Sequence, residues 1–150
     1  MGAPRSVRLS DDVAARLDRH VRRTGGSTSS VIERLLDEAL RVAEHPLVFF
    51  QDGTSGRRPK LQGGPSVASV VSALWDIRAE RGPRPGDDQA VVRELIEVCG
   101  ISERLVRAAI SYYAQFTDEI DAWIRDNRAY ADEMEQAWLR EHEILRGPAA

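Results

Sequence analysis

The first 45 residues contain one short strand pattern and two short amphipathic helix patterns, which is too little to enclose a core. Val7 and Leu9 alternate with polar residues between Arg5 and Ser10, and this period of two predicts a strand. A strand of this length is not stable alone, and two helices packed on one side of it bury little apolar surface. The sequence therefore predicts a homodimer, in which two chains pair their strands antiparallel and pack four helices beneath them.

The two helices are bounded by local signals. The first is expected to start after Ser10, a good N-cap residue, and to end at Gly25-Gly26. The second is expected to run from about Ser27 to about Ala43. The order is thus strand, helix, glycine turn, helix.

The outward face of such a paired ribbon is suited to DNA. Val7 and Leu9 would face the helices, which leaves Ser6, Arg8 and, before them, Pro4 pointing outward. A two-stranded ribbon fits the major groove, where arginine can bind guanine in a bidentate way and serine can contact several base edges. The alternative is that the same residues form an edge strand of one larger domain.

The segment resembles the ribbon-helix-helix family of bacterial repressors and antitoxins (CopG/Arc/MetJ-like). The resemblance lies in residues 6–13, Leu17, residues 25–32 and Leu35-Leu36. It implies that the outward strand residues read bases and that the start of the second helix grips a phosphate. A helix start attracts anions through its free N–H groups, which supports the second role. The expected base-reading residues are Pro4, Ser6 and Arg8, and the expected phosphate-binding residues are Ser27, Thr28 and Ser29.

The middle of the chain predicts a small helical domain with a short β-hairpin. The hairpin is expected over residues 47–61, with helices over 66–81, from Asp87 or Asp88 to Val98, and from Glu103 onward. Residues 57–67, the helix to Leu74 and residues 101–113 resemble the small helical domain of the DUF433 type, found in many bacterial antitoxins. This resemblance implies a PIN-like nuclease toxin as partner.

The last two of these helices form a helix-turn-helix outline around a glycine-containing turn. In a DNA-binding interpretation, Arg104 and Arg107 would point outward from the second helix. In the other interpretation, these arginines are a solvated face and the domain is an interaction module. The mixed charge of the surrounding sequence favours the interaction module.

A long final helix is expected from Asp118 to about Leu145. Residues 118–146 contain nine acids and four arginines. Apolar residues at helical spacing are typical of helix-in-groove recognition, and equally of a core or a coiled-coil seam. The terminal position and the acidic charge favour a partner-binding arm. Its expected contact residues are Ile120, Trp123, Ile124, Tyr130, Met134 and Trp138.

The sequence thus predicts a mainly α protein in three parts: a ribbon-helix-helix dimer over 1–45, a helical domain over 46–117 and an amphipathic helix over 118–150. The predicted function is that of an antitoxin that binds operator DNA as a dimer, represses its own operon and neutralises a nuclease toxin. The alternative is a free-standing transcriptional regulator. Whether dimers assemble further along DNA is left open.

Other classes find little support. The three histidines lie far apart and beside no metal-ligand pattern, no phosphate-binding loop motif is present, and neither a catalytic residue nor a cofactor is expected. The single cysteine, Cys99, is expected to be a small buried residue in a turn. The net charge of −3 argues against nonspecific coating of nucleic acid. No signal peptide or membrane span is expected, which predicts a cytoplasmic protein.

Overall fold

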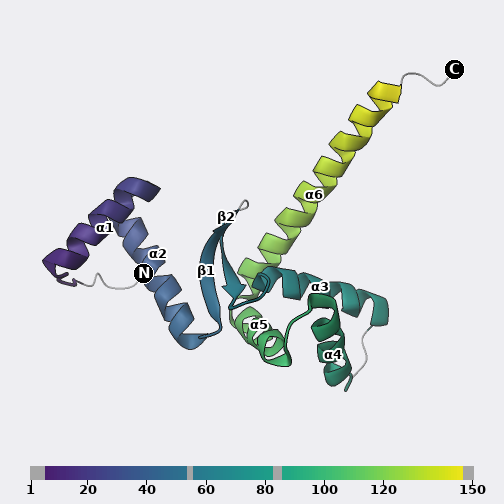
Figure 1. Cartoon of the computed structure of the whole chain (residues 1–150), viewed down its shortest axis with the longest axis horizontal. Coiled ribbons are helices and arrows are strands. Elements are labelled where there is room, and N and C mark those ends of the chain that lie inside the picture. The colour runs from purple at the N-terminus through teal and green to yellow at the C-terminus, as the bar shows by residue number, and fades with distance from the viewer. Residues whose placement is uncertain (1–5, 54–55, 83–85, 147–150) are drawn as a thin grey trace. The chain divides into compact units, whose positions relative to one another are not determined.

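The chain folds into two compact units, residues 1–44 and residues 45–150. The computed structural model describes one chain over residues 6–53, 56–82 and 86–146, which form six helices and one β-hairpin (Figure 1). Among these residues, no helix combines the length and the apolar character needed to cross a bilayer.

The first unit contains the two predicted helices, α1 (Asp11–Thr24) and α2 (Thr28–Glu44). The Ser10 hydroxyl accepts a bond from the Val13 N–H at 3.5 Å and so caps the start of α1. Helix α1 ends at Gly25, whose φ of +76° favours glycine and whose N–H donates to the Val21 carbonyl. The helix boundaries predicted from capping residues are confirmed.

The predicted strand is not formed in this single chain. Residues 6–10 have no regular secondary structure, and all five are exposed. The start of the strand at Arg5 lies outside the described residues. The prediction requires a strand from a second chain to supply the hydrogen bonds, so the paired ribbon stays a prediction for the dimer.

The second unit begins with an antiparallel hairpin of β1 (Val48–Gly53) and β2 (Gly56–Leu61). Val48 pairs with Leu61, and both side chains are fully buried. Helix α3 (Val67–Arg81) is the central element, because it contacts β2, α4, α5 and α6. A helix surrounded in this way needs apolar residues on several faces. The buried residues of α3 are Val67, Ala68, Val70, Val71, Leu74 and Ile77.

The predicted helix-turn-helix outline is confirmed as α4 (Asp88–Cys99) followed by α5 (Glu103–Gln115). Gly100 joins them in the left-handed conformation, with φ 63° and ψ 32°, which favours glycine. Ile101 is buried in the turn. The turn at Gly64 lies close to this region, because a Cβ on Gly64 would meet Ile101 Cγ2 and Leu105 Cδ1, each at 3.6 Å.

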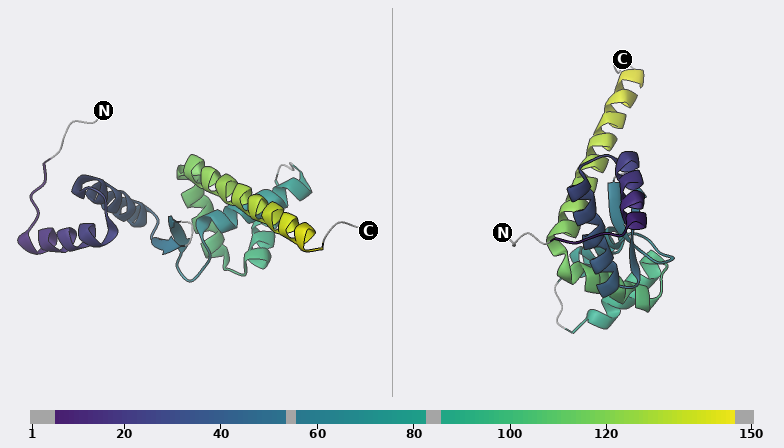
Figure 2. Two further views of the ribbon diagram at one scale, coloured as in Figure 1. Left: turned by 90° about the horizontal axis from the view of Figure 1, so that it is seen from above. Right: turned by 90° about the vertical axis from the view of Figure 1, so that its left-hand side faces the viewer.

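Helix α6 (Thr117–Arg146) is divided between core and solvent. Ile120 and Ile124 are buried, and Arg128 bonds to Asp76 at 2.7 Å and to the Ser72 hydroxyl at 2.9 Å, both on α3. Beyond Arg128, no residue of α6 is buried, and the helix extends away from α3, α4 and α5 (Figures 1 and 2). The first turns of α6 thus complete the core of the second unit.

Candidate nucleic-acid interface and partner-binding helix

An apolar groove of about 1270 Å³ lies on the first unit. Helix α1 contributes no buried residue, and on α2 the only buried hydrophobic residue is Val31. Val7 is 76% exposed and Leu36 57% exposed. A single chain therefore leaves most of its apolar surface uncovered here. The apolar lining residues of the groove are Val7, Leu9, Val13, Leu17, Ile32, Leu35 and Leu36.

The residues predicted to read bases lie next to this groove in the chain. Ser6 and Arg8 are exposed, and they alternate with the groove residues Val7 and Leu9. Pro4 lies outside the described residues. If Val7 and Leu9 turn inward as a strand, Ser6 and Arg8 must turn outward, because successive side chains in a strand point to opposite faces.

The start of α2 offers free backbone donors. The Ser27 hydroxyl accepts a bond from the Ser30 N–H at 3.1 Å and donates to the Ser30 hydroxyl at 3.0 Å, so its role is to cap the helix. The N–H groups of Thr28 and Ser29 precede the capped one and lie in an exposed stretch. The structure thus separates the three predicted phosphate-binding residues into one cap residue and two residues with available donors.

The predicted contact residues of α6 fall into two groups. Ile120 and Ile124 are each 2% exposed and belong to the core, so they are not available to a partner. Trp123 is half-buried, and the Arg58 guanidinium lies 4.6 Å from the centre of its ring. These three residues therefore support the fold of the second unit.

The other predicted residues of α6 are exposed. Tyr130, Met134 and Trp138 are each more than half exposed, at a spacing of four residues. Sequence reasoning left out three further exposed apolar residues of α6, of which Leu145 continues the stripe because it follows Trp138 by seven residues. The omitted residues are Leu139, Ile144 and Leu145.

A cysteine and a tyrosine of the second unit have shifted pKa values. Burial raises the pKa of the Cys99 thiol, which disfavours the reactive thiolate. Burial and a 2.7 Å hydrogen bond to Asp121 raise the pKa of Tyr113. In the part of the chain that the structure describes, no group of three His, Cys, Asp or Glu side chains could hold a metal ion.

Residues 6–41, which lie within the first unit, match the model of a known family. The matched family is described as "Ribbon-helix-helix protein, copG family", and proteins of this class bind DNA and are usually dimeric. The match indicates a DNA-binding transcriptional regulator. No curated protein and no solved structure matches the chain. The DUF433-type resemblance of the second unit stays a prediction.

Proposed function

We propose that this protein is a dimeric repressor that binds operator DNA through its first unit. The observation that carries this proposal is the uncovered apolar groove, in the segment that matches the ribbon-helix-helix family. A second copy is the natural occupant, because its residues 6–10 would supply the missing partner strand and its apolar side chains would cover the groove. The interface would then be two-fold symmetric, and each chain would give and receive the same contacts.

In this dimer, Arg8 and Ser6 of both chains read base edges from the paired ribbon, together with Pro4 before them. Arginine supplies two donors in a fixed geometry that matches guanine. The backbone N–H groups of Thr28 and Ser29 hold a phosphate, and Ser27 caps the start of α2. These contacts would fix the position of the ribbon in the major groove without reading sequence.

Arg8→Ala tests the base-reading role. Duplexes enriched from a randomised pool by the full chain would serve as the operator probe in a band-shift titration. Each good base contact contributes about 1–3 kcal/mol, and a two-fold dimer loses it twice, so specific binding should fall at least tenfold. The dimer should remain intact, because Arg8 faces away from the groove. Unchanged affinity would refute the assignment.

We further propose that α6 beyond Arg128 binds a protein partner, which makes the repressor an antitoxin. This part has 18 residues and spans about 27 Å at 1.5 Å per residue, and it carries the exposed stripe of Tyr130, Met134 and Trp138. Aromatic and methionine side chains are frequent anchors of a helix in an apolar groove. The DUF433-type resemblance suggests a PIN-like ribonuclease as the toxin.

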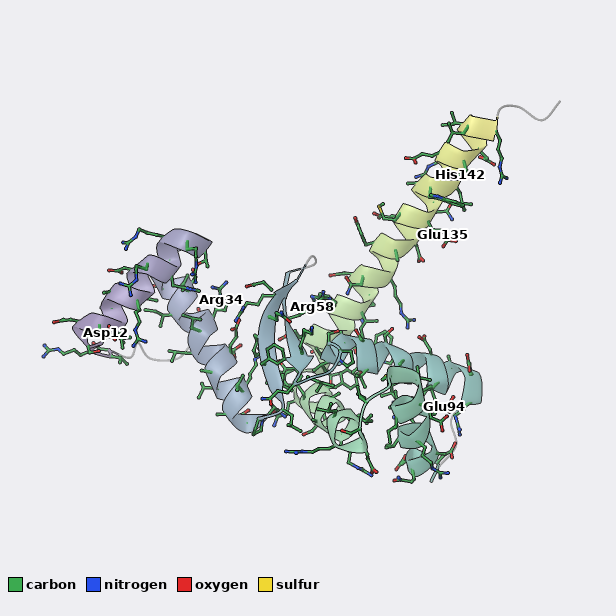
Figure 3. The ribbon with its side chains drawn as sticks, viewed as in Figure 1. Asp12, Arg34, Arg58, Glu94, Glu135 and His142 are labelled. Atoms are coloured by element: carbon green, nitrogen blue, oxygen red, sulfur yellow. The ribbon has the colours of Figure 1, made fainter. Side chains whose placement is uncertain are left out.

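The charge of this part of α6 favours a basic partner over a second copy. Residues 129–146 contain five acids and two arginines. Glu141 follows Met134 by seven residues and therefore shares its stripe. In a parallel pair of copies the two Glu141 side chains would face each other, which is unfavourable. Figure 3 shows Glu135 and His142 on the part of α6 that no other element of the second unit covers.

The structure also fixes where the chain should be cut to test this proposal. Truncation after Thr117 would remove Ile120 and Ile124 from the core, whereas truncation after Arg128 keeps them. The shorter protein should bind operator DNA as before and should fail to bind or inhibit a ribonuclease encoded beside its own gene. If no such gene exists, the free-standing regulator is the better description. If the truncated protein loses its dimer, the stripe is a coiled-coil seam.

A further inference from the structure

We infer that the second unit contains a second DNA-contacting surface, formed by the outward face of α5 in the α4–turn–α5 motif. The inference rests on the proposed function, because the first unit would bring the DNA to this surface. The match to the ribbon-helix-helix family ends at residue 41, so it does not cover α4 or α5.

The geometry of the motif is that of a supported helix-turn-helix. Helix α3 contacts both α4 and α5, and α4 contacts α5, so the three helices share one core (Figure 1). Leu95, Val106 and Ala109 are fully buried in that core. In a DNA-binding helix-turn-helix, the first turns of the second helix enter the major groove. The corresponding face of α5 must therefore be free of other elements.

The outward stripe of α5 meets this requirement. Arg104, Arg107 and Ser111 are exposed and lie at positions three and four residues apart, which places them on one face. The small side chain of Ala108, half-buried between them, permits close approach. Arginine can pair with guanine, serine can contact several bases, and alanine can contact the thymine methyl group.

The two exposed arginines have different surroundings. Arg107 bonds to Glu103 at 2.6 Å and to Gln89 of α4 at 3.3 Å, so it links the two helices. Arg104 has no ion-pair partner among the residues that the structure describes. Arg104 is therefore the residue that we assign to base contact, and Arg107 is a positioning residue.

The electrostatics are more favourable than the net charge of the chain suggests. Residues 45–117 contain nine lysines and arginines and eight acids, whereas residues 118–150 contain four arginines and nine acids. The acidic excess thus lies in α6. Near the motif, Glu103 is paired with Arg107, and Asp87 and Glu94 are both paired with Arg81. These paired carboxylates repel DNA less than free ones would.

Attachment to the first unit strengthens a weak second contact. Once the first unit holds the duplex, α5 meets DNA at a high effective concentration. A duplex long enough to reach both units should therefore bind more tightly than one that fits the first unit alone.

The test compares two duplexes taken from one enriched sequence, a 60-base-pair duplex and its central 20 base pairs, with the full chain. Arg104→Ala should shorten the hydroxyl-radical footprint on the long duplex and weaken binding to it about tenfold or more, with no change on the short one. Ser111→Glu, on the same stripe, should act in the same way. Arg125→Ala is the matched control, since Arg125 is an exposed arginine on α6.

Failure of the α5 surface and failure of the first-unit proposal give different results. Wild-type footprint and affinity for both α5 variants on the long duplex would overturn the inference. Arg8→Ala, measured in parallel, should abolish the central footprint. If it leaves the centre protected while the α5 variants lose binding, the second unit is the DNA-binding site and the first-unit proposal fails. If the full chain enriches no duplex from the randomised pool, both the inference and the first-unit proposal are wrong.

Discussion

Leu36→Ala tests whether the apolar groove of the first unit is the dimer interface. Leu36 lies on α2 and lines the groove, with 57% of its surface exposed in the single chain. Fully burying a leucine side chain stabilises a protein by about 1.5–3 kcal/mol. Because roughly half of Leu36 is exposed, a second copy that covers it would gain about 1 kcal/mol from each chain. A two-fold interface counts this contribution twice. The substitution should therefore cost the dimer about 2 kcal/mol, which is about a 30-fold increase in its dissociation constant.

Sedimentation equilibrium of the full chain over a range of concentrations would measure this constant. Circular dichroism on the same samples would show whether the dissociated chain keeps its helices. Leu139→Ala is the matched control, because Leu139 is 44% exposed and lies on α6, away from the groove. Equal dimer affinity for wild type and Leu36→Ala, with weaker affinity for Leu139→Ala, would refute the groove as interface and point to α6.

Three further substitutions or modifications test other parts of the structure. Ser29→Glu should weaken binding to the enriched duplex and to a random duplex of the same length by similar factors in a band-shift titration, because the added carboxylate repels a phosphate held by the backbone donors and a phosphate contact reads no sequence; a changed base preference would contradict this role. Leu61→Ala should lower the free energy of unfolding by about 2–5 kcal/mol in urea titrations, since Leu61 is fully buried; a loss well under 1 kcal/mol would show that the hairpin is not part of the core. Cys99 should react with iodoacetamide at pH 7 more slowly in the folded protein than in urea, because burial raises its pKa and reduces the thiolate fraction; equal rates would contradict the burial.

The sequence by itself determined where the helices begin and end. Ser10, Gly25 and Gly100 mark helix boundaries through their own capping and backbone preferences, and these depend on only a few neighbouring residues. The hairpin and the helix-turn-helix outline could be predicted for the same reason. The candidate base-reading residues followed from the strand period of two, which needs no tertiary information.

Only the tertiary structure decided which apolar residues find partners. Ile120, Ile124, Tyr130 and Trp138 all share the helical periodicity of one apolar stripe, yet the first two are buried and the last two are exposed. Periodicity defines a face of a helix, but the length of α6 that α3 and the hairpin can cover depends on the size of the core. Likewise, the mixed charge around α5 could be counted in the sequence, but the pairing of Glu103 with Arg107 and of Glu94 with Arg81 required the positions of the side chains. Burial and ion pairing are decided by distances between segments, and a single sequence does not contain those distances.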